Sequence, residues 1–190
     1  MTTVIDAILK RSSEPRLQEP APSPDVLEEA FRCAARAPDH ALLRPWRYLV
    51  IEGKGLESLG KLFAATADQG STTLAQDREK LQRMPQRAPM VIVGIVSPRP
   101  HPKVPQVEQE MSAAVGMGYL LLALQSAGYG GIWRTGEIAR DRRVSEGLGL
   151  ADHESIAGFL YVGSVVSEKP EVPRPELESF VARWPADDAG

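Results

Sequence analysis

Arginine and hydroxyl side chains gather directly after the first predicted helix of the chain. Arg11, Ser12 and Ser13 follow one another, and Arg16 comes shortly afterwards. A guanidinium and two hydroxyl groups at one bend suit a phosphate, whose oxygens accept charge-assisted hydrogen bonds from arginine. The same residues are also typical of a helix end whose charges complement the helix dipole. Taken alone, this cluster leaves both interpretations open.

A second candidate cluster surrounds Pro38, which must end a helix. Arg36 lies just before this proline and His40 just after it, followed by Pro45 and Trp46. Because the residue before a proline avoids the helical conformation, the helix stops sharply and both side chains project from a stiff corner. They are candidate ligand contacts, and the alternative is a capped helix followed by an ordinary loop.

A third cluster, Gly130-Gly131-Ile132-Trp133-Arg134-Thr135, combines paired glycines with an aromatic ring and a cation. The glycines let the backbone approach a flat ligand closely, Trp133 can pack beside such a ligand, and Arg134 adds positive charge. A core tryptophan on a short strand explains the same residues equally well.

Composition argues against several other functions. His40, His101 and His153 lie far apart and Cys33 is the single cysteine, so we expect no metal centre and no intramolecular disulfide. The chain has neither a GxSxG turn nor a glycine-rich phosphate loop, so nothing favours a hydrolase or a Rossmann dehydrogenase. A net charge of -3 provides no basic field for nucleic acid or lipid. Without a visible export signal, we expect a soluble cytoplasmic protein.

Hydrophobic periodicity predicts the elements that position these clusters. Ser23 and Pro24 are typical of a helix N-terminus. Residues 55–82 are helical but polar, which predicts exposed helices with a break at Gly70 and Ser71. Strands are predicted over residues 48–51, 90–96, 131–133 and 156–162, and helices over 4–11, from 24 onward, over 106–127 and over 141–148.

Together these elements predict one domain over residues 1–190, an α+β or α/β layer with about four strands. The unusual element is the long helix over residues 106–127, which is apolar on nearly all sides. Such a helix must be buried on nearly all sides. In a chain of this size a dimer interface is a simple way to cover it.

The three clusters also occur in an order that resembles a known family. An RRS-like motif, then RAPDH followed by PW, a proline-rich loop, EQEMSA and GYGGIWRTG resemble the small single-domain branch of the FMN-dependent nitroreductase family. The resemblance runs from about Lys10 to Gly163. It departs from the family pattern at Ser12, where an arginine is common, and Lys10 and Arg16 are the neighbouring cations that could compensate.

The resemblance implies an α+β nitroreductase-like fold with a central mixed sheet of about four to five strands packed by helices. It implies a homodimer with the long helix in the dimer core and FMN at the subunit interface. The resemblance places Arg11, Ser12 and Ser13 at the phosphate and ribityl end of FMN. It places Arg36 and His40 of the other subunit against the same flavin, with Trp133, Arg134 and Thr135 beside it.

The implied activity is an NAD(P)H-dependent oxidoreductase that reduces nitro compounds, quinones or similar small acceptors by a ping-pong mechanism. No dedicated catalytic residue is expected, because the flavin supplies the chemistry. Two alternatives remain open at this stage. The first is a flavin-binding or flavin-remodelling member, or a specialised dehydrogenase, without general nitroreductase activity. The second is a flavin-free interaction module in which the clusters serve only as caps and core.

Overall fold

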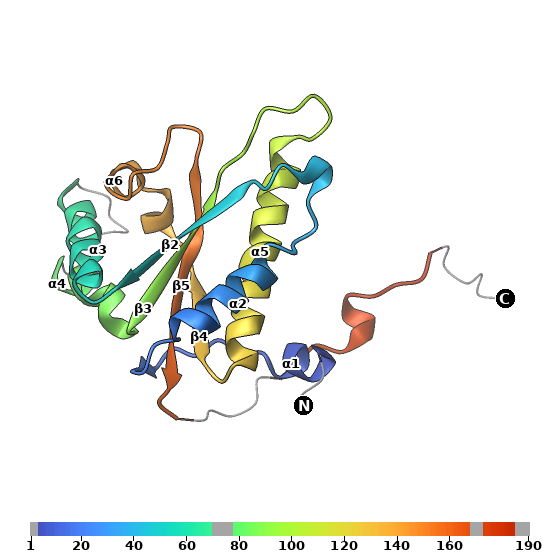
Figure 1. Ribbon diagram of the computed structural model, residues 1–190, viewed down its shortest axis with the longest axis horizontal. Coiled ribbons are helices and arrows are strands. Elements are labelled where there is room, and N and C mark those ends of the chain that lie inside the picture. The colour runs from blue at the N-terminus through green and yellow to red at the C-terminus, as the bar shows by residue number, and fades with distance from the viewer. Residues whose placement is uncertain (1–3, 70–77, 168–172, 185–190) are drawn as a thin grey trace.

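A five-stranded antiparallel sheet forms the centre of the protein in the computed structural model, which describes residues 4–69, 78–167 and 173–184 (Figure 1). The longest strand, β5 (Ser155–Val165), pairs with β3 (Met90–Val96) along one edge and with β4 (Gly130–Arg134) along the other. β2 (Trp46–Glu52) pairs with β3, and the two-residue β1 (Leu17–Gln18) pairs with the end of β5. The predicted α+β class is confirmed.

The strand directions differ from the predicted mixed sheet. β3 and β4 run in the same direction and are joined by a helix, as in a β-α-β unit. They are not neighbours, however, because β5 lies between them and opposes both. Every strand pair in the described part of the chain is therefore antiparallel.

Helices cover both faces of the sheet (Figure 1). α2 (Pro24–Ala34) and α5 (Gln106–Ser126) pack on one face. α3 (Lys54–Ala65), α4 (Arg78–Arg83) and α6 (Arg142–Gly147) pack on the other. Short 3₁₀ helices span His40–Leu42 (η1), Thr66–Gln69 (η2), Met84–Arg87 (η3), Glu137–Arg140 (η4) and Leu177–Ser179 (η5).

β3 shows why both faces need a cover. All of its residues are buried, and side chains alternate between faces with the period of two that a strand imposes. Met90 and Ile92 join the cluster under α2 and α5, whereas Val91 and Val93 join the cluster under α3, α4 and α6. The continuous apolar run of this strand therefore indicates a two-sided core.

The predicted exposure of residues 55–82 was wrong for α3. Leu59 and Phe63 are each only 1% exposed, and Phe63 packs edge-to-face on Phe159 with ring centroids 5.1 Å apart. The apolar residues of α3 follow helical spacing among its polar ones, so one stripe of a polar helix is buried. The predicted break at Gly70 and Ser71 lies outside the described residues.

α5 is buried along one side and exposed along the other. At Gly94 of β3 an added Cβ would lie 2.2 Å from Met117 Sδ, so the glycine permits a close approach of helix and sheet. On the opposite side, four apolar residues at every fourth position form an exposed stripe: Val107 (51% exposed), Met111 (61%), Val115 (37%) and Tyr119 (37%). A single chain therefore does not bury this helix on nearly all sides. Among the described helices, none is long and apolar enough to cross a membrane.

The first helix and the last described segment of the chain lie at the periphery of the protein (Figure 1). α1 (Val4–Lys10) has no buried residue, and the C-terminal segment 173–184 lies beside it. Arg174 Nη2 donates to the carbonyl oxygens of Leu9 and Arg11 at 3.1 and 2.9 Å, which ties the two ends together. Trp184 in this segment is 94% exposed.

Candidate functional site

The Arg11–Ser13 cluster is fastened between the end of α5 and the beginning of β4. Gln125 Nε2 donates to the carbonyl oxygen of Ser12 at 2.7 Å. The backbone N–H of Glu14 donates to the carbonyl oxygen of Gly131 at 3.0 Å. The segment therefore runs beside the first residues of β4, and an element far away in the sequence sets its conformation.

A cavity of about 320 Å³ opens beside this segment. Lys10 and Arg11 bring two positive charges to it, and Glu14 brings one negative charge. The Ser12 hydroxyl also lines the cavity and donates to the Glu14 carboxylate. The charges that line the cavity are therefore net positive, which suits an anion such as a phosphate, while the proton of the Ser12 hydroxyl is taken up by Glu14. Ser13 is exposed beside it.

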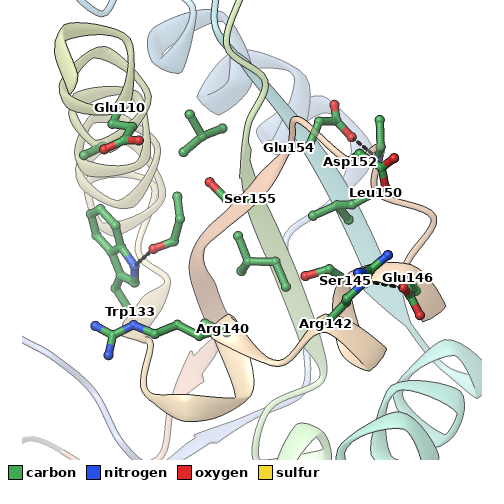
Figure 2. A pocket seen from close by; sticks show the side chains of 16 residues that line it. Glu110, Trp133, Arg140, Arg142, Ser145, Glu146, Leu150, Asp152, Glu154 and Ser155 are labelled. Atoms are coloured by element: carbon green, nitrogen blue, oxygen red, sulfur yellow. Dashed lines mark hydrogen bonds and ion pairs between the residues drawn. The ribbon is translucent and has the colours of Figure 1, made fainter. Parts of the chain in front are cut away.

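The other end of β4 borders a larger cavity of about 780 Å³ (Figure 2). β4 stops where Arg134 pairs with Phe159, so it leaves the first residues of β5 uncovered on this edge. Trp133 partly covers them, and its indole Nε1 donates to the Ala157 carbonyl oxygen at 3.2 Å. The cavity thus lies where a strand is missing from the edge of the sheet, and its volume lies within the range of small-molecule sites.

The walls of the larger cavity come from both helical layers (Figure 2). Glu110 of α5 and Arg140 of η4 lie on the same side as Trp133, and α6 lies opposite. On α6, Arg142 Nε donates to Glu146 Oε1 at 2.6 Å, so these two charges compensate each other. No side-chain partner of Arg140 is found in the described part of the chain. The apolar part of the lining consists of Val96, Ala114, Trp133, Ala139, Leu150, Ala151, Ile156 and Ala157.

An ion pair fixes the loop that leads into β5. Arg47 Nε of β2 donates to Glu154 Oε1 at 2.7 Å, and the Glu154 side chain is 6% exposed. The hydrogen bond from Arg47 lowers the pKa of the Glu154 carboxyl to about 2, against the opposing effect of burial. Glu154 lines the larger cavity directly before Ser155 and Ile156, so the ion pair holds this part of the cavity wall in place.

Arg134 lies on the face of the sheet opposite Trp133, as expected for neighbours in a strand. Its Cζ lies 5.7 Å from the centroid of the Tyr161 ring. Its Nε is buried and has no hydrogen-bond partner within the described chain. Burial raises the pKa of Tyr161 to about 12, so the phenol stays neutral beside the cation. Thr135, the next residue, is exposed.

His40 and Arg36 lie away from these cavities. Both are exposed, and His40 Nδ1 lies 2.9 Å from Glu108 Oε2 in the first turn of α5. Glu110 is turned by about 200° around the helix from Glu108, so α5 stands between His40 and the larger cavity. At a rise of about 1.5 Å per residue, α5 also separates Glu108 from Gln125 by about 26 Å. Within one chain, the Arg11–Ser13 segment lies near the start of β4, and Trp133, Arg134 and Thr135 lie at its end. Arg36 and His40 lie apart from both groups.

Sequence reasoning missed several residues of these cavities. Glu110 and Arg140 reach them from helices, and Ala157 from the uncovered edge of β5. The hydrogen bond between Gln125 and Ser12 joins residues far apart in the sequence. The residues around Gln125 therefore do not indicate it.

Comparison with known proteins identifies the family of the chain. The sequence model of the Nitroreductase family matches residues 8–164. The chain belongs to the nitroreductase family. The expected class, an oxidoreductase, is thereby confirmed, and the match includes all three clusters.

Individual relatives extend the comparison. The chain is 37% identical over 163 residues to the Escherichia coli (strain K12) protein named "Putative NAD(P)H nitroreductase YdjA", covering 84% of this chain and 87% of that one. A nitroreductase-like family protein from Bacillus cereus has a similar structure, with a TM-score of 0.85, 21% identity and 96% of each chain covered. The FMN and NADPH-dependent nitroreductase NfnB from sphigopyxis sp. strain HMH matches with a TM-score of 0.74 and 18% identity, covering 95% of this chain and 98% of that one. These two structural neighbours support the nitroreductase-like fold.

Proposed function

We propose that the protein is an FMN-dependent NAD(P)H oxidoreductase that reduces nitro compounds, quinones or similar small oxidised acceptors. The observation that carries this proposal is the pairing of two cavities along one strand. A small cationic cavity with Lys10, Arg11 and Ser12 lies at the start of β4, and a larger cavity beside Trp133 lies at its end. An elongated ligand with a phosphate at one end and a flat ring at the other suits both.

The residues present fit FMN in two further respects. Lys10 and Arg11 supply cationic donors for a phosphate, and in the proposed complex the phosphate replaces Glu14 as the acceptor of the Ser12 hydroxyl, with Ser13 next in the same segment. Arg134 holds a buried guanidinium nitrogen without a partner in the described residues, beside the strand end. In the proposed complex, Arg134 and Arg36 supply positive charge that favours a reduced, anionic ring. Trp133 and Thr135 flank the ring.

FMN, when bound, would accept a hydride from NAD(P)H and pass electrons to the acceptor. The chain's own part is to bind the phosphate, orient the ring and admit one small molecule at a time to the larger cavity. Nicotinamide and acceptor would use this cavity in turn, which gives ping-pong kinetics. Parallel lines in double-reciprocal plots at several NAD(P)H concentrations would support that order, and intersecting lines would count against it.

We infer a homodimer as the functional unit, in which the exposed stripe of α5 packs against the same stripe of a second chain. Two observations support this: the exposed stripe itself, and the length of α5, which places about 26 Å between Glu108 beside His40 and Gln125 beside Ser12 within one chain. If the two α5 helices pack antiparallel, the N-terminal end of one lies beside the C-terminal end of the other. Arg36 and His40 of the partner subunit would then reach the flavin held by Arg11. We place the enzyme in the cytoplasm, where a free thiol such as Cys33 stays reduced.

The visible absorption spectrum of the purified protein, before and after anaerobic addition of NADPH and then NADH, tests the proposal. Oxidised-flavin bands that bleach with either donor would support it. Bands that resist both donors would favour a flavin-binding member without this activity. A colourless protein that takes up no FMN on soaking would refute it.

A further inference from the structure

The side chain of Gln125 occupies an unusual position at the end of α5. Its Nε2 donates to the Ser12 carbonyl oxygen at 2.7 Å, but its Oε1 is buried and has no hydrogen-bond partner in the described structure. A buried amide oxygen without a partner destabilises the folded protein, because it has lost its water without replacement. A leucine of similar size would avoid this cost.

The hydrogen bond from Gln125 Nε2 holds the backbone of the cationic segment. Ser12 lies in the cationic segment, between Arg11 and Ser13, and it lacks a regular secondary structure to fix its backbone. The segment is tethered on its far side by the hydrogen bond from Glu14 N to Gly131 O. Gln125 supplies the tether at Ser12 itself, and it lines the same 320 Å³ cavity as Lys10 and Arg11.

We propose that Gln125 is a positioning residue for the phosphate of the flavin. Through Nε2 it holds the Ser12 backbone so that the Arg11–Ser13 segment presents its donors to the cavity before the ligand arrives. This inference rests on the proposed function, since it assumes that the cavity takes FMN. A segment that is already ordered binds its ligand more tightly, because binding then costs less conformational entropy.

The test uses Gln125→Leu and Gln125→Glu in the full-length protein, each stripped of flavin and titrated with FMN and with riboflavin. Leucine removes both the Nε2 donor and the unpartnered oxygen, whereas glutamate keeps the shape, removes the donor and adds a negative charge. For Gln125→Leu we expect FMN to bind about tenfold more weakly, as for one lost hydrogen bond, and for Gln125→Glu more weakly still, because its carboxylate repels the phosphate. Riboflavin, which has no phosphate, should lose less than about threefold. Gln82→Leu, an exposed residue of α4 that lines neither cavity, is the matched control.

Thermal unfolding of the flavin-free proteins separates positioning from simple structural support. We expect the melting temperature of Gln125→Leu to equal or exceed that of the wild type, because the buried unpartnered oxygen is gone. A loss of stability together with equal weakening of FMN and riboflavin would overturn the proposal, and so would unchanged FMN affinity. If the wild type itself binds no FMN, the proposed function fails first, and the inference fails with it.

Discussion

His40 Nδ1 lies 2.9 Å from Glu108 Oε2, and this contact joins the loop after α2 to the first turn of α5. The two side chains are 57% and 45% exposed, so solvent screens the interaction. Its consequence is orientation more than stability. With Nδ1 held by a carboxylate, the other ring nitrogen of His40 is left to face outward.

The first prediction concerns this contact. Glu108→Gln should change the free energy of unfolding by less than about 1 kcal/mol, as for other exposed pairs. FMN affinity should nevertheless fall several-fold, because the ring of His40 loses the carboxylate that orients it. Chemical denaturation and fluorescence titration measure the two quantities. Glu28→Gln, which removes a similarly exposed partner of Arg32, should alter neither. Unchanged FMN affinity in Glu108→Gln would remove His40 from the proposed flavin contacts.

The second prediction concerns Arg11. Arg11→Ala should weaken FMN binding by about 10- to 100-fold, because charge-assisted hydrogen bonds to a phosphate are among the stronger ones. The fold should be retained, since the Arg11 side chain lines a cavity and is not part of either core cluster. Flavin content after purification and circular dichroism check both statements. Arg32→Ala, an exposed arginine on α2, is the matched control. Full flavin content in Arg11→Ala would contradict the assignment.

The third prediction concerns the exposed stripe of α5. Met111→Glu should raise the dimer dissociation constant about a hundredfold or more, because a two-fold axis places the introduced charge in the interface twice. Analytical ultracentrifugation over a range of concentrations measures the change. Lys61→Glu, on the exposed side of α3, should leave the oligomeric state unaltered. If the wild type sediments as a monomer at all concentrations, the proposed dimer is wrong.

The fourth prediction concerns the ion pair of Arg47 with Glu154. The pKa of Glu154 is lowered to about 2 in the folded protein, so the unfolded state binds a proton more readily. The stability from this pair is therefore complete above the unfolded pKa, near 4.3, and is lost as the pH falls towards 2. Glu154→Gln should cost about 1 to 2 kcal/mol at pH 7, after allowance for the partly exposed arginine.

Urea denaturation of both proteins between pH 7 and pH 2.5 measures this effect. The difference between wild type and Glu154→Gln should shrink over the acid part of the range. A difference that stays constant with pH would show that the pair contributes by packing alone. Glu146→Gln, whose pair with Arg142 lies at the surface, should show a much smaller effect.

Local sequence patterns predicted the elements whose boundaries depend on nearby residues. β3 was predicted over residues 90–96, as found, because its apolar run has strand length. Ser23 accepts a hydrogen bond from Val26 N at the start of α2, as its residue type indicated. β1 was missed because Leu17 and Gln18 become a strand only through pairing with Val165 and Ser164 at the other end of the chain.

The candidate site was predictable only in part for the same reason. The residue types of Arg11, Ser12 and Ser13 suit an anion site and a charged helix end alike, so the sequence alone leaves both interpretations open. The cavity beside Trp133 depends on where β4 stops relative to β5, which is a property of strand register. Arg140 could be assigned to the larger cavity only once the structure showed its 3₁₀ helix beside Trp133.

The length of α5 has a genetic consequence. If each site takes Arg11 from one chain and His40 from the other, then Arg11→Ala and His40→Ala chains are each defective alone but complementary when mixed. In a mixed pair, one site collects both lesions and the other collects none. Random exchange of equal amounts would therefore restore about a quarter of the sites, so that two inactive alleles expressed together recover activity.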